Sequence, residues 1–561
     1  MSRRSVSIIL IVGLLGGLAW YSAFLAANRI YQVDECQNIY MARVLATGQT
    51  SDFFTNGSLF LLGPLSWLTS TLKQSENIFA AARLLFLGLF WLNLFLVALI
   101  AGKRIRSIEG MIALAGAATL APLWDYGFEV RHDNLILTGI LLIWWLVRVR
   151  PMGAPSYLGA GAITVALLFI AVKSVVYVLP LALAVLLFPP PGHQRSRLQL
   201  ALAWIGGAIA SLLVIRLCYG TGGKWDIYLS VFHGVAKYSA GAEGSVRFGP
   251  WYTLSRLPAQ MPLVVALSFA AVIAVVVEVV RRGRAAFTWN GNLPEVLLAA
   301  GAMAGLFLNP APFTYNVLHL VPYLFLLVFS YGWNLWQELQ TKPILWPAVG
   351  CIVLLGHLVP FGLSVKRHAD YRNYRQTAFM RLAEDLTRPT TDAVYDGIGM
   401  VPTRRSIHFN WYLHSLNIRN FLSGSAPSVR EMLAAQPAAV LIRSYRTDWL
   451  TQEDQEFIQS RYVPLSDDFW VLGRELPPGG GDVEIVHPGR YCVAPMGTAT
   501  NSVCSVDGAV SADKPVALAI GIHRIETQSS QRLRIYWVGP KLDRVPPIGG
   551  GDRHKLFVNG Y

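Results

Sequence analysis

The feature that most constrains this chain is a series of apolar runs in its first 365 residues. Eleven runs lie at residues 6–27, 78–101, 108–123, 134–149, 157–173, 175–188, 198–217, 260–280, 293–309, 317–336 and 344–364. A helix needs roughly 20 apolar residues to cross a bilayer, or fewer if it is buried among neighbours. Since 53% of the 561 residues are hydrophobic and only 14% are charged, most of the chain cannot form a water-solvated surface. The runs predict a polytopic α-helical membrane protein with about 11 transmembrane helices.

The basic residues between the runs predict the topology. Short Lys and Arg clusters, for example within residues 103–106 and 281–284, fall on every second loop, as they do in cytoplasmic loops of membrane proteins. The net charge of +14 therefore reflects topology and does not indicate a nucleic-acid partner. With a cytoplasmic amino terminus, an odd number of crossings places the chain after about residue 365 on the other side. We expect a multi-pass protein of a bacterial inner membrane with an extracytoplasmic carboxyl-terminal domain.

The sequence pattern changes after residue 365, where the long apolar runs end. Residues 366–476 alternate helical patterns with short β-branched runs, which predicts a small α/β module. The Pro-Pro-Gly-Gly-Gly stretch at 477–481 is typical of a linker. Residues 482–561 hold short strand patterns broken by Gly, Asp and Pro, which predicts a compact β-sandwich, with carbohydrate binding as one candidate function. The expected domains are therefore 1–365, 366–476 and 482–561.

Two of the five cysteines are predicted to form a disulfide. Cys492 and Cys504 share the small β-domain, lie within one hairpin's reach and would face an oxidising compartment. Cys36, Cys218 and Cys351 lie far apart in or beside apolar runs, and the sequence contains no CxxC pair that would predict a metal or redox site.

The polar segment after the first apolar run is where chemistry is expected. Asp34 and Glu35 are adjacent carboxylates at a membrane boundary, and Ile39, Val44 and Leu45 follow at positions compatible with a helix. Adjacent acids at such a place suit either a solvated helix cap or the mouth of a lipid-facing cavity. The two alternatives give Asp34 and Glu35 a structural or a catalytic role.

This segment resembles the Asp-Glu loop of the glycosyltransferase C (GT-C) superfamily, in the family 39-like branch that contains protein O-mannosyltransferases and lipid A aminoarabinose transferases. Further segments match in family order over roughly residues 6–365: Ala81–Arg83 at the start of the second run, Arg131-His132-Asp133 at an Arg-Pro-Asp position, Val172-Lys173-Ser174 at a Thr-Lys-Gly position, and residues 232–252 before the eighth run. Two segments depart from the pattern. Leu62-Gly63-Pro64-Leu65 lacks the usual first-loop cation, and His319-Leu-Val-Pro322 replaces Arg-Tyr-x-x-Pro.

The resemblance implies an inverting glycosyltransferase that moves a hexosyl or pentosyl group from a polyprenyl-phosphate donor to a glycan, lipid or protein acceptor. Asp34 is the expected general base, because an acceptor hydroxyl needs a group that takes its proton. Glu35 is expected to support Asp34 or to bind a divalent metal, the one cofactor that the resemblance leaves open. The motifs do not identify the sugar or the acceptor.

Cations are expected to meet the phosphate leaving group. Lys173 interrupts an apolar stretch, where an ammonium is costly unless it has a partner; the alternative is that it reaches the interface as an anchor. Arg131 and Asp133 lie in a short outward loop and either pair with each other or contact the donor. Three basic residues of a long extracytoplasmic loop are further candidates for substrate binding: His233, Lys237 and Arg247.

Two other classes of function fit part of the pattern. An intramembrane lysine and paired acids also suit a proton-coupled transporter or flippase, although such proteins usually show two similar halves and none is evident here. A non-catalytic envelope assembly protein would use the β-domain for carbohydrate and the membrane part as an anchor.

Overall fold

The computed structural model divides into two compact units. It describes residues 3–47, 59–102, 107–149, 152–187, 196–220, 225, 249–283, 293–308, 313–339, 346–408, 411–413, 415–495, 504–511, 514–528, 530–546 and 556–557. The helical unit comprises Met1–Arg29, Thr55–Gly63 and Ala82–Tyr371, and the mixed unit comprises Ile30–Phe54, Pro64–Ala81 and Arg372–Tyr561. Two short segments near the amino terminus therefore belong to the unit that contains the carboxyl-terminal third of the chain.

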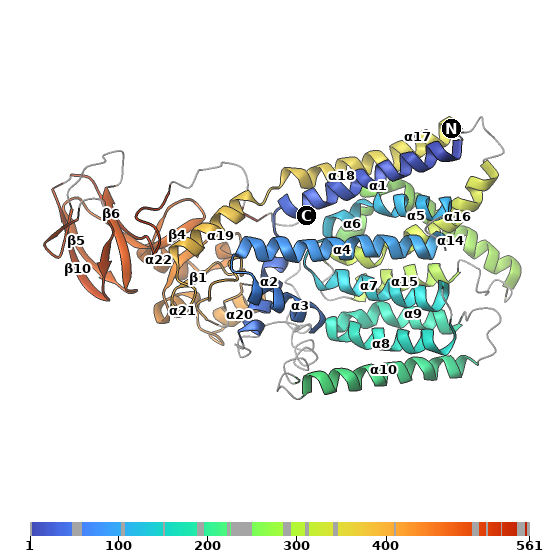
Figure 1. The fold of residues 1–561 in the computed structure, drawn as a ribbon, viewed down its shortest axis with the longest axis horizontal. Coiled ribbons are helices and arrows are strands. Elements are labelled where there is room, and N and C mark those ends of the chain that lie inside the picture. The colour runs from blue at the N-terminus through green and yellow to red at the C-terminus, as the bar shows by residue number, and fades with distance from the viewer. Residues whose placement is uncertain are drawn as a thin grey trace. The chain divides into compact units, whose positions relative to one another are not determined.

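The helical unit is built almost entirely from apolar helices (Figure 1). Its elements are α1 (Arg3–Asn28), most of α4 (Ser75–Gly102), α5 (Ile108–Ala118), α6 (Ala121–Tyr126), α7 (His132–Trp144), η2 (Trp145–Val149), α8 (Ala154–Ile170), η3 (Val172–Ser174), α9 (Val175–Leu187), α10 (Arg197–Gly220), α12 (Pro250–Ser255), α13 (Leu257–Gln260), α14 (Pro262–Arg282), α15 (Leu293–Leu308), η5 (Thr314–His319), α16 (Val321–Leu339), α17 (Trp346–Val353), η7 (Leu354–Leu358) and α18 (Val359–Asp370).

The apolar helices lie where the sequence predicts them. Among the described residues, seven are long and apolar enough to cross a membrane and four more are apolar but shorter. Each of the eleven predicted runs coincides with one of these helices. The polytopic α-helical prediction is confirmed.

The distribution of exposed side chains shows what surrounds this unit. Only 17% of the most apolar stretch of α1 is buried within the protein, compared with 61% for the central helix His132–Val149. On α1, Leu10 is 67% exposed and Trp20 is 70% exposed. Helices that are apolar on all sides and lack protein cover need lipid as their solvent, because so large an apolar surface is unfavourable in water. The protein is therefore a multi-pass membrane protein.

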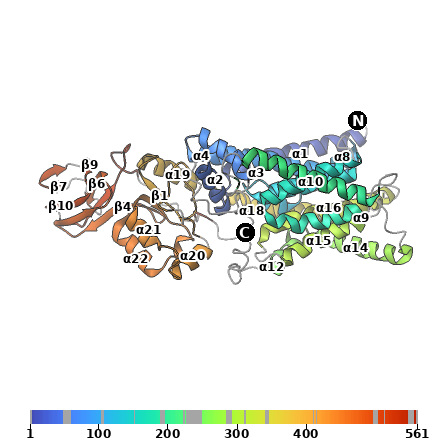
Figure 2. The same cartoon turned by 90° about the horizontal axis from the view of Figure 1, so that it is seen from below.

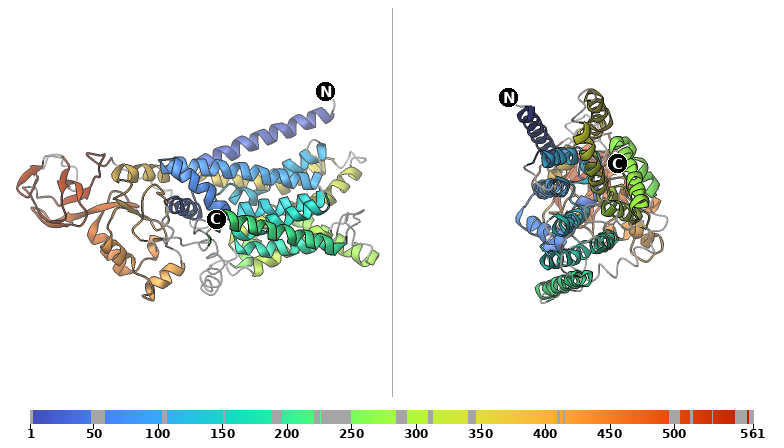
Figure 3. Two further views of the ribbon diagram at one scale, coloured as in Figure 1. Left: turned by 60° about the horizontal axis from the view of Figure 1, so that its bottom comes forward. Right: turned by 90° about the vertical axis from the view of Figure 1, so that its right-hand side faces the viewer.

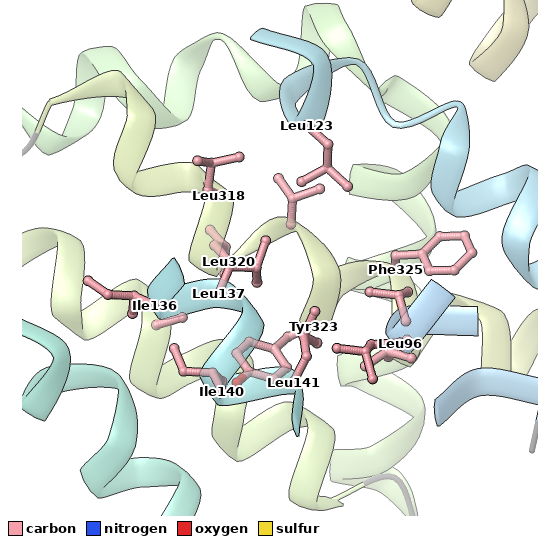
Figure 4. Close-up of a cluster of buried hydrophobic side chains, with 14 of the residues drawn as sticks. Leu96, Leu123, Ile136, Leu137, Ile140, Leu141, Leu318, Leu320, Tyr323 and Phe325 are labelled. Carbon is pink, nitrogen blue, oxygen red and sulfur yellow. The ribbon is translucent and has the colours of Figure 1, made fainter. Parts of the chain in front are cut away.

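The core of the helical unit forms around α7. Ile136, Leu137, Ile140 and Leu141 share one face of this helix and pack with the segment 318–325, which leads into α16 (Figure 4). Spacings of three and four residues, as between Leu137 and Ile140 or Ile136 and Ile140, place side chains on the same side of a helix. This packing fixes the start of α7, where Asp133 lies, and the end of η5, where His319 lies.

Glycines allow α8 and α10 to approach closely (Figures 1 and 3). A Cβ atom at Gly161 of α8 would lie 1.9 Å from the carbonyl oxygen of Trp204, and one at Gly207 of α10 would lie 1.9 Å from that of Leu158. Small residues let helix backbones touch where no difference in hydrophobicity drives association. These two glycines are therefore required for the contact between α8 and α10.

The mixed unit combines helices and two sheets. Its helices are α2 (Val33–Ala46), most of α3 (Leu59–Thr71), α19 (Tyr374–Leu386), α20 (Ser415–Leu422), α21 (Val429–Ala435), η8 (Thr447–Trp449) and α22 (Gln452–Arg461). Its strands are β1 (Ala393–Tyr395), β2 (Ala438–Ile442), β3 (Tyr462–Pro464), β4 (Phe469–Leu476), β5 (Gly480–Ile485), β6 (Gly489–Pro495), β7 (Cys504–Val506), β8 (Ala509–Ser511), β9 (Val516–Leu518), β10 (Gly521–Thr527) and β11 (Leu533–Trp537). Figure 2 shows α20, α21 and α22 grouped beside β1 and β4.

The larger sheet runs across the predicted boundary at 477–481. Its order is β1-β2-β4-β11-β6-β9, with β3 paired to β4, and the smaller sheet has the order β5-β10-β7-β8. Because β11 pairs antiparallel with both β4 and β6, strands from both sides of residue 480 share one set of ladder hydrogen bonds. The stretch expected to be a linker is instead the turn between β4 and β5. Gly479 and Gly480 have φ angles of 86° and 101°, which favour glycine.

The predicted disulfide is not formed. Cys492 lies on β6, opposite Tyr536 of β11, whereas Cys504 lies on β7, opposite Thr527 of β10. Both sulfurs are present as buried thiols. The two residues are on strands of different sheets and therefore do not share the hairpin on which the prediction relied.

Candidate active-site clusters

A charged cluster in the helical unit gathers around Asp133, which lies in the first turn of α7 and is fully buried. Lys173 places its Nζ 2.6 Å from Asp133 Oδ1, and His319 Nε2 lies 3.5 Å from the same oxygen. On the other carboxylate oxygen, the Nε of Arg131 and the Nε2 of His132 each lie at 3.5 Å. The structure therefore brings together three predicted site residues: Arg131, Asp133 and Lys173.

Lys173 occupies a break between two apolar helices. α8 ends at Ile170, the short helix η3 covers Val172–Ser174, and α9 begins at Val175. The break directs the ammonium at Asp133, so this carboxylate meets the requirement for an anionic partner inside the membrane. The Lys173 side chain remains 24% exposed, although that of Asp133 is fully enclosed. Lys173 is therefore the accessible member of the pair.

Arg131 links two buried carboxylates. Its Nη1 lies 3.7 Å from Glu129 Oε2. Its Cζ lies 3.7 Å from the ring centroid of Tyr315, over which Lys173 also lies at 5.0 Å. A cation close to an aromatic face is stabilised by the ring quadrupole. Tyr315 thus keeps two positive charges close together beside one carboxylate.

Glu129 is also neutralised by Arg29 from the end of the first helix. The Nη2 of Arg29 lies 2.6 Å from Glu129 Oε1 and donates to the carbonyl of Asp125 at 3.0 Å, and both paired side chains are fully buried. Arg83 donates to the carbonyl of Arg29 at 2.5 Å. Paired charges with satisfied donors are tolerated inside a low-dielectric interior, and an unpaired one is not. Arg83, one of the resembling positions, therefore has a structural contact at the end of α1.

A second polar network joins three helices of the same unit. Asp125 accepts a hydrogen bond from Gln260 Nε2 at 2.7 Å, and His368 Nε2 lies 2.6 Å from its other oxygen. Asp125 lies on α6, Gln260 on α13 and His368 near the end of α18. The network ties the last apolar helix to the segment that carries Glu129 and Arg131.

In the mixed unit, Asp34 and Glu35 lie in the first turn of α2. Glu35 is fully buried and its Oε2 accepts a hydrogen bond from the backbone N–H of Gln32 at 2.9 Å. This is an N-terminal cap, so Glu35 stabilises the helix start. Asp34 is partly exposed. The two adjacent acids therefore have different environments, and of the two only Asp34 is partly accessible.

Asp34 lies in the electrostatic surroundings of Tyr412 and Arg446. Burial raises the pKa of Tyr412 far above its ordinary value, and the charge of Asp34 acts in the same direction. Burial alone lowers the pKa of Arg446, but Tyr412, Tyr445 and Asp34 raise it above its ordinary value. Nothing in the local sequence around Asp34 indicates these two residues, because they lie in the carboxyl-terminal third of the chain.

The other residues singled out in the sequence lie outside these clusters or outside the described residues. His233, Lys237 and Arg247 lie outside the described residues. Trp251 and Tyr252, at the end of the resembling segment 232–252, are 72% and 41% exposed. Within the described part of the chain, no group of three or more His, Cys, Asp or Glu residues is arranged to hold a metal ion. One oxygen of Glu35 is occupied by the Gln32 amide, so this carboxylate fits a helix cap better than a metal ligand.

Sequence reasoning missed several members of the charged cluster. Arg29 follows the first apolar run and His319 lies in a segment already noted for departing from the family pattern, so both carried a weak signal. For Arg29 and His319, the signal was a charged or titratable residue at one end of an apolar run. Tyr315 carried no such signal, since an aromatic residue near a membrane boundary is ordinary.

The chain matches no protein-family model and no curated protein. Its fold is similar to that in the crystal structure of ArnT from Cupriavidus metallidurans in the apo state, with 13% sequence identity, a TM-score of 0.53, and coverage of 84% of this chain and 98% of that chain. A structure of the archaeal oligosaccharyltransferase AglB from Archaeoglobus fulgidus, in complex with an inhibitory peptide and a dolichol-phosphate, shares 12% identity at a TM-score of 0.48, covering 87% of this chain and 74% of that one.

ArnT and AglB both belong to the GT-C superfamily. A sequence identity of 13% to ArnT supports a shared fold but does not establish which reaction this chain carries out. The likeness to ArnT nevertheless spans most of both chains. The chain has a GT-C-type fold, as the resemblance in its sequence predicted.

Proposed function

We propose that this protein is a membrane glycosyltransferase that moves a sugar from a polyprenyl-phosphate donor to an acceptor at the extracytoplasmic face of a bacterial inner membrane. The observation that carries the proposal is the Asp133 cluster, with its partly exposed Lys173 side chain, inside a fold similar to that of ArnT. A lipid-linked donor also explains why the unit that holds this cluster is embedded in a membrane.

The charged cluster suits the phosphate of such a donor. It contains three cations, Lys173, Arg131 and Arg29, and two carboxylates, Asp133 and Glu129, so one positive charge is left over before the histidines are counted. Arg29 is fully buried against Glu129. The unbalanced charge therefore belongs to Lys173 and Arg131, which share Tyr315 and a single carboxylate. Cations at this position would bind the donor phosphate and stabilise the charge that develops as it leaves.

Asp34 is the proposed general base. In an inverting transfer, the acceptor oxygen attacks the anomeric carbon from the face opposite the phosphate and the bond to the phosphate oxygen breaks. The acceptor proton passes to the Asp34 carboxylate, and the polyprenyl phosphate leaves with the bonding electrons. Glu35, which caps α2, supports Asp34 by fixing the helix turn that both residues share. The step uses this chain's own residues.

An assay of purified protein with a panel of radiolabelled polyprenyl-phosphate sugars tests the proposal. We expect transfer from at least one donor to envelope glycan, lipid or protein, and a loss of about 10²–10⁴ in rate for Asp34→Asn, the usual effect of removing a positioned general base. Asp385→Asn is the matched control, because Asp385 is an exposed carboxylate of the same unit that pairs with Lys541 at 3.0 Å.

Two results would contradict the proposal. Transmembrane movement of the sugar lipid without transfer would indicate a transporter or flippase. Parental transfer rates in Asp34→Asn, with a donor already shown to be a substrate, would mean that the base lies elsewhere.

A further inference from the structure

His319 is a buried histidine that the proposed mechanism does not use. It ends η5 in the helical unit and is fully enclosed by protein. Within the part of the chain that the structure describes, neither Nδ1 nor Nε2 of its ring makes a hydrogen bond. A neutral imidazole carries one N–H donor and one acceptor nitrogen, and leaving both unsatisfied in a water-free interior is unfavourable. Such a group in a folded protein needs an explanation, which its neighbours supply.

The surroundings of His319 hold its ring beside Asp133. Leu318 and Leu320, on either side of it, are fully buried in the core around α7 (Figure 4). The Tyr177 ring of α9 lies 4.2 Å from the His319 ring, centroid to centroid. On the Asp133 side, Nε2 lies 3.5 Å from Oδ1, about 0.5 Å beyond the usual length of an N–H···O hydrogen bond. A small movement therefore converts this approach into a hydrogen bond.

The oxygen that His319 approaches is the one that Lys173 already holds. The Lys173 ammonium donates to Asp133 Oδ1 at 2.6 Å, whereas Arg131 and His132 approach the other oxygen, each at 3.5 Å. The two groups on Oδ1 come from different elements, Lys173 from η3 and His319 from η5. If the ammonium leaves Oδ1, His319 is the group that the structure places beside this oxygen.

Binding of a phosphate gives the Lys173 ammonium a reason to leave Oδ1. Its side chain is 24% exposed, whereas that of Asp133 is fully enclosed, and a lysine carries its charge on a flexible four-carbon stem. Turning toward a phosphate takes from Asp133 its shortest hydrogen bond. A buried carboxylate that loses a partner is strongly unfavourable, so this loss weakens phosphate binding unless a second donor replaces the ammonium.

We propose that His319 is a positioning residue that takes the place of Lys173 on Asp133 when the ammonium turns to the donor phosphate. The inference rests on the proposed function, in which Lys173 meets that phosphate. The imidazole stays neutral, in the tautomer that carries its proton on Nε2, and no proton is transferred. Asp133 thus has two alternative donors to one oxygen, Lys173 in the free site and His319 in the phosphate-bound site.

The first test needs neither donor nor activity. Tm in detergent is measured for the parental protein, His319→Leu, Lys173→Met and the double variant. His319→Leu should not lower Tm, because it removes two unsatisfied nitrogens. In Lys173→Met, His319 becomes the donor to Asp133, so the double variant should lose more than the sum of the two single changes. Additive changes, or a marked fall in Tm for His319→Leu alone, would overturn the exchange.

The second test measures binding of polyprenyl phosphate without a sugar, with the matching polyprenol as the phosphate-free reference. We expect His319→Leu to weaken binding of polyprenyl phosphate about 10- to 100-fold, the range for leaving a buried charged group short of one hydrogen bond, and to leave polyprenol binding unchanged. His319→Gln keeps an N–H donor and should recover part of the affinity. His357→Leu is the matched control and should keep it, since His357 is a buried histidine of the same unit that instead bonds Thr119 at 2.8 Å.

The outcomes separate the two proposals. If the parental protein binds no polyprenyl phosphate and transfers no sugar while the stability cycle shows coupling, the proposed function fails and the alternation of Lys173 and His319 on Asp133 stands. If the parental protein binds polyprenyl phosphate and His319→Leu binds it equally well, the positioning role is wrong and the proposed function is unaffected. A loss of affinity shared equally by His319→Leu, His319→Gln and His357→Leu would show a general structural effect and would also overturn the role.

Discussion

At the scale of single residues, Asp133 changes the interpretation of Lys173. The sequence places a lysine in an apolar stretch, which predicts an anionic partner, and the donor phosphate was the expected one. The structure supplies Asp133 at 2.6 Å. A cation that already has a carboxylate can still bind phosphate if a neighbouring cation shares that carboxylate, and Arg131 does so at 3.5 Å. The donor-binding role of Lys173 thus stays a prediction, now with Asp133 and Arg131 as its partners.

Substitution of Lys173 distinguishes a donor contact from a purely structural pair. We expect Lys173→Met to weaken binding of the polyprenyl-phosphate sugar and to cost about 1–3 kcal/mol in stability, because Asp133 loses its nearest hydrogen-bond donor but keeps Arg131 and His319 nearby. Lys173→Arg should retain part of the binding, because it keeps the charge and changes its shape. Donor titration and thermal unfolding in detergent measure the two effects.

A second substitution provides the control. In the double variant Lys173→Met/Asp133→Leu, the buried carboxylate is removed together with its partner, so stability should recover relative to Lys173→Met. Donor affinity should not recover if the ammonium contacts the phosphate. Unchanged donor affinity in Lys173→Met would leave Lys173 with a structural role alone.

At the scale of elements, the packing of α2 against residues 396–413 depends on the backbone at Gly399. This glycine has a φ of 86°, and an added Cβ would collide with Tyr40. Gly424 has a φ of 68° but nothing within 4 Å of an added Cβ. Comparing alanine substitutions at Gly399 and Gly424 therefore separates the loss of stability from backbone strain from the loss caused by displacing α2.

We expect Gly399→Ala to destabilise the protein by about 2–4 kcal/mol, combining left-handed backbone strain with overpacking. Gly424→Ala should cost only about 1–2 kcal/mol from the backbone. Sugar transfer should fall in Gly399→Ala because the turn that carries Asp34 moves. Equal losses of Tm in the two variants would show that α2 does not depend on this contact.

A second element-scale contact joins the start of β1 to the turn before β6. Arg388 Nη2 lies 2.7 Å from Asp392 Oδ1 and His487 Nε2 lies 3.0 Å from it. Burial alone raises the pKa of Asp392, but the hydrogen bonds from His487 and Arg388 hold it below its ordinary range. A carboxyl whose folded-state pKa is lowered stabilises the fold above its unfolded-state value of about 4, and this contribution is lost as the pH falls below that value.

We therefore expect the unfolding temperature of the parental protein to fall more steeply than that of Asp392→Asn between neutral pH and about pH 3. Asp385→Asn, at an exposed ion pair, should follow the parental curve. Parallel curves for the parental protein and Asp392→Asn would mean that this carboxylate contributes nothing to acid sensitivity.

At the scale of the whole molecule, the predicted topology places residues after about 365 outside the cytoplasm. Protease added to intact spheroplasts should cleave a carboxyl-terminally tagged protein to give a fragment of roughly 190 residues, visible on a denaturing gel. Non-covalent contacts within the mixed unit should hold the fragment until denaturation, since Tyr31 bonds Gln376 and Ser75 bonds Glu384. Protection in spheroplasts with cleavage only after lysis would reverse the sidedness.

The sequence alone was sufficient for the membrane helices, the general fold and part of the site. Eleven apolar runs became apolar helices because burial in lipid depends on local composition and length, which a sequence states directly. Short strands were likewise predicted within residues 366–476 and 482–561, and the structure has strands there, for example at 438–442 and 533–537. Alternating and β-branched patterns act over a few residues, so a sequence shows them directly. Arg131, Asp133 and Lys173 were found as candidates because charges among apolar residues are unusual wherever they occur.

Only the tertiary structure decided which of these residues meet. It paired Asp133 with Lys173, set Cys492 and Cys504 in different sheets, and drew residues 30–54 into the unit that contains Arg446. Each of these outcomes depends on positions that are not neighbours in a helical turn. Such contacts depend on how elements pack and on the strand order, and a single sequence carries no local signal for either.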